Sequence, residues 1–386
     1  MPQRESSRTG LAILAVTVGI LALCLALACG CGKTSSRPST SRENKPASPL
    51  ARLRAEVEKL VSVAAAGDVN FGDGVTPYLS SNGVDYPWPD AGAVFSIADL
   101  SFVNLECCIS STGEPVPGKE YCFRGPVDSA GGIKRAGVDV VSLANNHSKD
   151  YGTNAFVETL GHLKESGVAW CGAGMNDAEA YTATVLEAHG RKVGFVAFTS
   201  IVPDGWPATS RSPGCATTWG KNTVAETIKR AREKCDYVVA SFHWGIELAT
   251  SPSGDQRGLA RLAVDSGADL VLGHHPHVVQ GFELYRNRLI AYSLGNFIFS
   301  PPREISSKTL SLVALLGPRG LVQAKIVPMV ISGSRPVILN GGAADSWLGT
   351  VAGYSRELGT GVSIRNGRGF IDGSAAPEGG TSNPAD

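Results

Sequence analysis

Five of the seven histidines lie in short polar segments, and each of these segments follows an apolar run: His147, His243, His274, His275 and His277. The step His275-Pro276-His277 is the most specific of them, because residues two apart in an extended segment place their side chains on the same side. Imidazole and oxygen ligands from separate loops suit a divalent ion such as Mn, Fe or Zn. A catalytic site of this kind keeps a position open for water, whose pKa falls towards about 7 on the ion.

Acidic and amide residues occupy the same kind of position. Asp68 follows the apolar run 61–66, Glu106 follows 101–103, and Asn146 follows 138–144. Taken singly these motifs are weak, since Gly67-Asp68 is compatible with a simple turn and an Asn with a helix cap. Together they gather at the ends of predicted strands, which is the edge where open α/β sheets bind ligands. The pattern therefore predicts a metal site at one edge of a sheet.

The elements that must position these residues are short apolar runs rich in β-branched side chains, which indicate buried strands. They cover 61–66, 101–103, 138–144, 193–199, 237–241, 270–272 and 289–292. Helical spacing marks 154–165, 223–234 and 256–266. This alternation predicts an α/β protein with a largely parallel or mixed sheet. Two later runs, 310–316 and 321–331, are expected to be strands of a second sheet, joined by a turn at 317–320.

The motifs also resemble a known family. They are Gly67-Asp68-Val69-Asn70-Phe71-Gly72, Asn104-Leu105-Glu106, Asn145-Asn146-His147, His243-Trp244-Gly245, His275-Pro276-His277 and Ser293-Leu294-Gly295-Asn296-Phe297. This ordered set, spread over 61–299, closely resembles the CapA proteins of bacterial capsule and poly-γ-glutamate biosynthesis. That family looks like a branch of the calcineurin-like metallophosphoesterases. The resemblance implies an α/β fold, a sandwich of two mixed β-sheets flanked by helices, with one or two metal ions at the strand ends.

The resemblance also implies roles for single residues. Asp68 would bind the first metal and Glu106 would bridge the two. Asn146 and His243 would bind the second metal, with His275 and His277 divided between the ions. Asn70 stands where phosphoesterases usually carry His, so it would be a weaker ligand of the first metal. His147 would be the general acid, with Asp150 in the same catalytic motif, and His274 is not expected to be a ligand.

Further residues are expected around the site. Asn104 and Asn145 are candidates for contacting the substrate, and Lys119 with Arg124 could hold an anionic substrate oxygen. Glu247 and Asp99 could orient metal-bound histidines from behind. Cys107 or Cys108 is expected to form a disulfide with Cys122, because the chain is predicted to leave the cytoplasm.

The first residues predict export. Arg4 and Arg8 precede an apolar run over 11–28, followed by Cys29-Gly30-Cys31. This is typical of a secretory signal with a lipobox, in which Cys29 or Cys31 is lipidated. An uncleaved helical anchor and simple secretion remain alternatives, since the run is just long enough to span a bilayer. The expected organisation is export segment 1–31, spacer and short helix 32–60, domain 61–372 and disordered tail 373–386, with the domain outside the cytoplasm.

The composition of the chain argues against one class of partner. The formal net charge is zero and the pI is near 7.0, so a nucleic-acid partner is not expected.

The first hypothesis is a cell-surface component of capsule or poly-γ-glutamate biosynthesis or export, acting near a membrane polymer-synthesis complex on an anionic polymer. The second is an exported phosphoesterase for monoesters or diesters. The third is a non-catalytic scaffold that keeps its metal for structural reasons.

Overall fold

The computed structural model describes residues 56–301 and 303–373. The predicted export segment, Cys29, Cys31, most of the spacer and the tail after residue 373 lie outside this range. Within the range, no helix is both long enough and apolar enough to cross a membrane.

The larger of two main sheets has ten strands in mixed orientation. They are β1 (Val61–Val69), β2 (Leu100–Leu105), β5 (Val140–Ser142), β6 (Ala169–Cys171), β15 (Asn296–Ile298), β16 (Lys308–Gly317), β17 (Gly320–Ser332), β18 (Arg335–Ile338), β19 (Ser363–Arg365) and β20 (Arg368–Asp372). Strand β1 pairs in parallel with β2, which leads on through parallel pairing to β5 and β6. Its partner on the other side, β16, runs antiparallel to it.

The position of β16 and β17 corrects one expectation. Both strands and the turn between them form where the sequence predicts, but they extend the first sheet instead of joining the second. Strand β16 pairs with β1 from Val61↔Leu316 to Ala66↔Ser311. This pairing satisfies an edge of β1 that would otherwise present unpaired backbone groups.

The second main sheet has six strands. They are β8 (Thr184–Ala188), β9 (Arg191–Thr199), β11 (Tyr237–His243), β12 (Leu270–His274), β13 (Phe282–Tyr285) and β14 (Arg288–Ala291). Strands β9, β11, β12 and β14 are parallel, so their carboxyl ends share one edge. Two short two-stranded sheets complete the set: β3 (Cys108–Ile109) with β4 (Arg124–Gly125), and β7 (Ala173–Gly174) with β10 (Gly214–Cys215).

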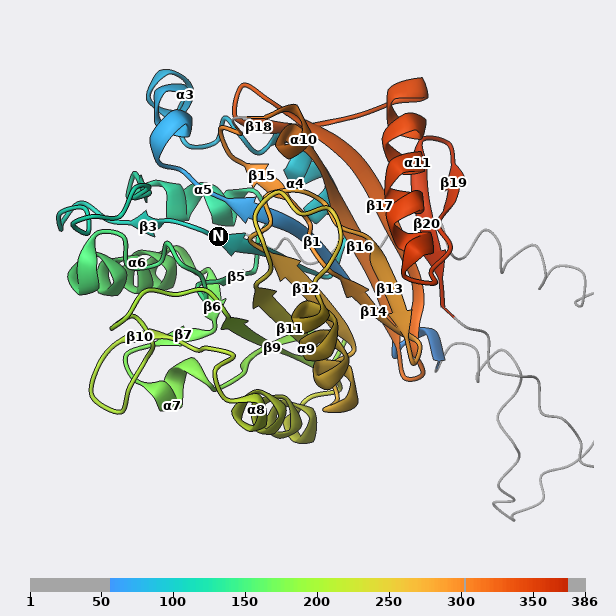
Figure 1. The fold of residues 1–386 in the computed structure, drawn as a ribbon, viewed down its shortest axis with the longest axis horizontal. Helices are drawn as coiled ribbons and strands as arrows, with labels where there is room; N and C mark the ends of the chain where they lie inside the picture. The colour runs from blue at the N-terminus through green and yellow to red at the C-terminus, as the bar shows by residue number, and fades with distance from the viewer. Residues whose placement is uncertain (1–55, 302, 374–386) are drawn as a thin grey trace, which may run out of the picture.

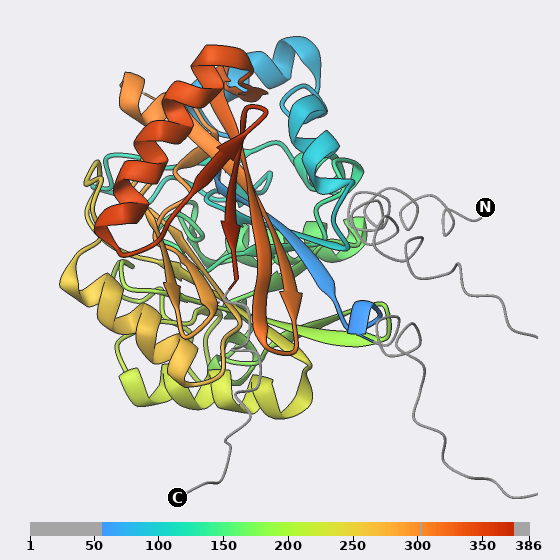
Figure 2. The same cartoon turned by 90° about the vertical axis from the view of Figure 1, so that its right-hand side faces the viewer.

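Helices flank the two sheets (Figure 1). They are α3 (Thr76–Asn82), α4 (Pro89–Phe95), α5 (Ser129–Arg135), α6 (Gly152–Ser166), α7 (Asp177–Ala180), α8 (Lys221–Lys234), α9 (Gly254–Asp265), α10 (Glu304–Ser307) and α11 (Gly341–Glu357), with a 3-10 turn at Asp73–Val75. The apolar sides of α4, α5 and α6 pack on the first sheet, and those of α8 and α9 pack on the second. Figure 2 shows α11, which the sequence patterns did not predict, lying beside the long strand β17.

The two sheets share a buried interior. Residues of both contribute to one apolar cluster, in which the rings of Phe102 on β2 and Phe195 on β9 stack with their centroids 6.1 Å apart. The prediction of an α/β sandwich of two mixed sheets flanked by helices is confirmed. The carboxyl end of β12 lies against that of β1, since His274 Nδ1 is 3.3 Å from Asp68 Oδ1.

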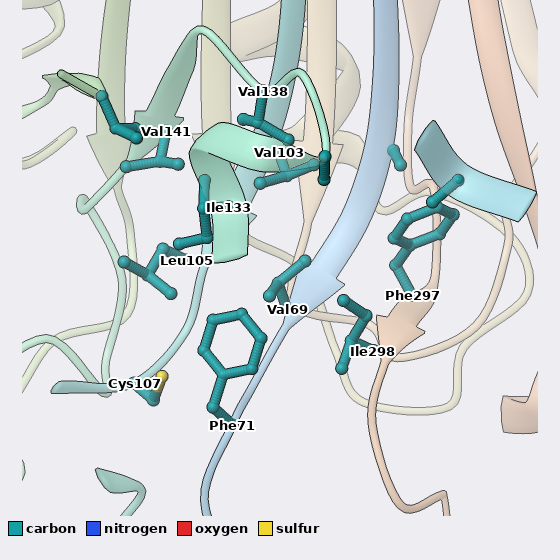
Figure 3. Close-up of a cluster of buried hydrophobic side chains, with 14 of the residues drawn as sticks. Val69, Phe71, Val103, Leu105, Cys107, Ile133, Val138, Val141, Phe297 and Ile298 are labelled. Atoms are coloured by element: carbon teal, nitrogen blue, oxygen red, sulfur yellow. The ribbon is translucent and has the colours of Figure 1, made fainter. Parts of the chain in front are cut away.

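Alternation along the strands explains how polar residues reach this edge. Val69, Leu105 and Ile298 point into the apolar cluster on the helix-covered face of the first sheet (Figure 3). Because successive side chains of a strand point to opposite faces, the neighbouring residue Asp68 points the other way, towards the second sheet. The cluster in Figure 3 therefore forms the apolar support under the polar edge.

The expected disulfide is not formed. Cys107, Cys108 and Cys122 are free, as are the other cysteines of the described part. The Cys108 Sγ atom lies 3.3 Å from the carbonyl of Ser148, whereas that of Cys122 lies 3.9 Å from the carbonyl of Lys119. The thiols thus lie against separate backbone segments, and burial raises the pKa of Cys108 to about 12.

Candidate metal centre

Four strand ends deliver the side chains of the candidate metal centre, which we define as Asp68, Glu106, His243, His275 and His277. Asp68 lies near the end of β1 and Glu106 directly follows β2. His243 is the last residue of β11, and the two other histidines follow β12. The separate loops therefore converge, but from the carboxyl ends of both sheets and not from the one sheet edge that was expected.

A close backbone contact at Gly67 holds this edge together. The amide of Asp68 donates a hydrogen bond of 2.9 Å to the carbonyl of Gly295. A Cβ atom at Gly67 would lie only 1.8 Å from that same carbonyl oxygen. Only glycine allows the two segments to approach so closely, and the contact sets the position of the Asp68 carboxylate.

The side chains form two groups of potential ligands that share Glu106. The first group is Asp68, Glu106 and His277, and the second is Glu106, His243 and His275; in each, the ligand atoms lie within 4.8 Å of one another. Glu106 Oε1 is 3.6 Å from His243 Nε2 and 3.9 Å from His277 Nε2. This is the division that the family resemblance implied, with Glu106 between two sites and one histidine of the His-x-His step on each.

The donor atoms fit a divalent cation. Glu106 Oε1 and His275 Nδ1 are buried, and neither has a hydrogen-bond partner. Leaving buried polar atoms unpaired costs about 1–3 kcal/mol for each group, so such atoms call for an explanation such as an ion. Carboxylate and imidazole donors match the preferences of Mn, Fe and Zn.

Asn146 and Asn70, the two remaining predicted ligands, differ in the contacts of their side-chain oxygens. Asn146 is half-buried and its Oδ1 lies 2.7 Å from His243 Nε2, which places the amide oxygen beside the second group. Asn70, in contrast, uses its Oδ1 to accept a hydrogen bond of 2.7 Å from the amide of Gly72. The Asn70 oxygen therefore stabilises its own turn, and the geometry does not support it as a ligand.

Asn104 and Asn145 form hydrogen bonds that support the residues of the centre, and they do not face a substrate. Both are fully buried. Asn104 Nδ2 donates to Asp68 Oδ1 at 2.9 Å and lies 3.4 Å from Glu106 Oε2. Asn145 Nδ2 donates to Asn104 Oδ1 at 3.1 Å, and its Oδ1 accepts from the amide of His147. These bonds hold the two carboxylates and the segment that carries His147 in register.

Burial governs the ionisation of the centre. Burial, together with the negative charge of Asp68, raises the pKa of Glu106 well above its ordinary value. For Asp68, burial alone would raise the pKa, but a hydrogen bond from His274 and the charges of His274 and His277 lower it. Burial and the neighbouring histidines lower the pKa of His243 well below its ordinary value and that of His275 to about 3. Neutral imidazoles are the form that binds metal.

His147 belongs to a second cluster beside the centre. Its Nδ1 lies 2.6 Å from Asp150 Oδ2, and Asp150 also accepts from Lys119 Nζ and from the amide of Phe123. The ring stacks on Phe123 at 4.3 Å, while Nε2 lies 3.9 Å from Glu106 Oε1. With Nδ1–H bound to the carboxylate, the Nε2 atom is the one available to a substrate. Burial lowers the pKa of His147, whereas Asp150 acts in the opposite direction.

Two predicted contributors lie elsewhere. The Arg124 guanidinium stacks over the Tyr151 ring at 4.2 Å and donates to the carbonyl of Gly113, so it is not directed at the centre. Asp99 accepts from the amide and hydroxyl of Ser62 and pairs with His189 at 2.7 Å. Because Ser62 begins β1, Asp99 lies at the opposite edge of the sheet and cannot orient metal ligands.

Two further residues lie beside the centre, and the predictions missed one of them, Asn296. His274, which was expected not to be a ligand, has a fully buried ring that faces Asp68. Asn296 Oδ1 lies 2.8 Å from His277 Nδ1, and its Nδ2 donates to the carbonyl of Ser306, so it orients the histidine. Its place in the Ser-Leu-Gly-Asn-Phe motif after a predicted strand is the signal that could have identified it.

Fold and site together define a two-sheet α/β protein whose carboxyl edge carries a candidate dinuclear metal centre. The family model described as bacterial capsule synthesis protein PGA_cap matches residues 62–301, and the chain belongs to this family. The capsule biosynthesis protein CapA of Bacillus anthracis is 30% identical over 288 residues, 73% of this chain and 70% of that protein. The PGA biosynthesis protein CapA of Bacillus subtilis is 29% identical over 250 residues, 64% of this chain and 66% of that protein.

Solved structures show weaker similarity. A hypothetical protein from Thermus thermophilus is 20% identical with a TM-score of 0.40, over 72% of this chain and 96% of that one. The NAD nucleotidase of Haemophilus influenzae is 12% identical with a TM-score of 0.37, over 75% of this chain and 55% of that one. Similarity at this level does not define a function.

Proposed function

We propose that this protein acts at the cell surface in the biosynthesis or export of capsule or poly-γ-glutamate, through a dinuclear metal centre at the carboxyl edge of its two sheets. The assignment to polymer assembly is supported by the family and by the two CapA relatives. The observation that carries the metal centre is Glu106, whose carboxylate belongs to both groups of potential ligands.

The ions would be held by Asp68, Glu106 and His277 on one side, and by Glu106, His243 and His275 with Asn146 on the other. Two ions so placed would supply Lewis acidity and a nucleophile at neutral pH. Carboxylate and imidazole ligands do not by themselves choose between Mn, Fe and Zn.

His147 would serve the leaving group. Its Nδ1–H is held by Asp150, which Lys119 contacts in turn, so the ring is fixed with Nε2 towards Glu106. A histidine oriented by a carboxylate can hand a proton to a departing oxygen or nitrogen. Lys119 Nζ also lies 3.0 Å from His147 Nδ1, beside the metal centre, where its charge could attract an anionic chain.

The N-terminal segment would keep the domain near the site where polymer emerges. This part of the proposal rests on the arginines, apolar run and Cys29 or Cys31 of the sequence, as a lipid anchor or an uncleaved helix. A membrane complex that synthesises the polymer is the partner expected in this position.

One experiment separates the three functional hypotheses. The purified full chain is loaded with Mn²⁺ and incubated with poly-γ-glutamate or with a chromogenic phosphodiester. Metal-dependent change in polymer length without diester turnover supports the assembly function. Diester or monoester turnover without an effect on the polymer would replace it with an exported phosphoesterase. Bound metal with neither activity would leave a scaffold.

A further inference from the structure

We propose that Glu247 is a third carboxylate ligand of the metal centre, supplied from the solvent side by the loop that follows β11. This inference rests on the metal centre of the proposed function and extends it. The Glu247 carboxylate forms a group with His275 and His277, with all ligand atoms within 4.8 Å of one another. These two histidines belong to different ligand groups, so Glu247 faces both of the candidate ion positions.

Glu247 differs from Glu106 in its exposure to solvent. Glu106 is fully buried, whereas Glu247 is exposed. No hydrogen bond or ion pair in the described part of the chain holds the Glu247 carboxylate. One carboxylate is thus closed to solvent, and the other lies at the solvent-exposed face of the centre, which we call its open face.

The loop is built to hold Glu247 in this place. The amide of Leu248 donates a hydrogen bond of 2.8 Å to the carbonyl of Pro276, the residue between the two histidines. Two residues before Glu247, Gly245 has a positive φ of 91°, and a Cβ there would meet the Gln256 side chain at 2.8 Å. Gln256 Nε2 donates to Gln280 Oε1 at 2.9 Å, and Gln280 Nε2 donates to the carbonyls of Ala249 and Ser251.

Backbone strain points to the same small region. Leu248, His275 and His277 have φ angles of 63°, 93° and 58°, which are unusual for residues with a side chain. Such conformations cost about 1–3 kcal/mol each and collect at functional sites, where the surroundings hold them. Here they lie on both sides of the Leu248–Pro276 hydrogen bond and bring the Glu247 segment against the His-x-His step.

A ligand is also needed at this centre. Asn70 does not supply it, because its oxygen accepts a hydrogen bond from the amide of Gly72. The first group then has only Asp68, Glu106 and His277. A further carboxylate from Glu247 would complete this set and would also place negative charge at the open face. Such charge favours the uptake of cations, because opposite charges attract at short range.

The test is the binding of Mn²⁺ to the full chain, measured by titration calorimetry and by elemental analysis after gel filtration. Glu247→Gln should weaken one of the two binding steps by more than about ten-fold, with Glu247→Asp in between. Glu226→Gln, which removes an exposed glutamate of α8, is the matched control and should bind as the wild type does. Because Glu247 is exposed, the metal-free variant should unfold at the wild-type temperature.

The outcomes distinguish this inference from the proposed function. Wild-type affinity and stoichiometry in Glu247→Gln would overturn the ligand role while leaving the metal centre intact. A wild-type chain that binds no Mn²⁺, Fe²⁺ or Zn²⁺ would overturn both. Loss of one ion in Glu247→Gln, with a wild-type chain that has no action on the polymer, would support the ligand and contradict the assembly function.

Discussion

Glu106 Oε1 lies 3.6 Å from His243 Nε2, and this oxygen accepts no hydrogen bond although it is fully buried. A direct hydrogen bond between a carboxylate and an imidazole would be shorter than this distance. His243 Nε2 lies closer to Asn146 Oδ1, at 2.7 Å, so Glu106 Oε1 is left as an unpaired donor atom for an ion. The Glu106 carboxylate is therefore the point at which both candidate ions would meet.

His243→Ala and His277→Ala should each remove metal from the chain. His243 belongs to one ligand group and His277 to the other, so each variant loses an imidazole that no neighbour can replace. We expect affinity for Mn²⁺ to fall by at least about ten- to hundred-fold, measured by elemental analysis after gel filtration. His189→Ala, at the opposite edge beside Asp99, is the control and should keep its metal. Full metal content in both site variants would contradict the assignment.

His147→Ala should keep metal and lose turnover. The ring faces Glu106 from 3.9 Å but is fixed by Asp150, and it belongs to neither shared ligand group. Removing a general acid typically costs about 10²- to 10⁴-fold in rate. The rate on whichever substrate the wild type turns over is compared with metal content in the same preparation. Hydrolysis at the wild-type rate would show that another group donates the proton.

Gly67→Ala should destabilise the fold and disturb the centre together. The new methyl group would meet the carbonyl of Gly295, which also accepts from Asp68. Overpacking of this kind costs about 1–3 kcal/mol or more, measured by denaturant unfolding. Gly258→Ala is the control, since this glycine of α9 has open space around it, and alanine favours helices by up to about 1 kcal/mol. A neutral effect of Gly67→Ala would mean that the β1–β15 contact is loose.

Acid should destabilise the metal-free protein through its buried histidines. The pKa of His275 is about 3 in the folded chain against 6.5 unperturbed, so the unfolded chain binds more protons between these values. Stability therefore rises with pH across this window. It is fully present above the unperturbed pKa and is lost as the pH falls.

The dependence of stability on pH provides the measurement. Between about pH 7 and pH 5, the free energy of unfolding should fall more steeply in the wild type than in His275→Gln. The two proteins are compared by the slope of this free energy against pH and not by its value, because the substitution also changes packing. Parallel slopes would contradict the buried neutral state of His275. Glu106 acts in the opposite direction, since its raised pKa favours the folded state at low pH.

The sequence could predict those features of the site that follow from the order of residues along the chain. The His275-Pro276-His277 step and the acidic residues after short apolar runs were sufficient to predict that these side chains gather, because parallel strands bring their carboxyl ends to the same edge of a sheet. The family motifs then divided the histidines between two groups, and the geometry has the same division.

What it could not reveal depends on contacts between distant segments. Asn104 and Asn145 lie behind the candidate ligands because the end of β2 packs against the segment that follows β5. The sequence does not predict this, since an Asn motif has the same appearance whether its side chain faces a substrate or supports a ligand. The place of β16 beside β1 is a choice of partner that apolar patterning does not encode. Glu247 reaches the centre only through the hydrogen bond between Leu248 and Pro276.

The most direct test of the dinuclear centre is a crystal structure of the full chain grown with Mn²⁺, with anomalous scattering recorded at the manganese absorption edge. We expect two anomalous peaks about 3.5–4 Å apart, with the Glu106 carboxylate between them and His243 and His277 on different ions. A chain that shows no manganese at this edge of the sheets, or manganese bound away from Glu106, would contradict the dinuclear centre.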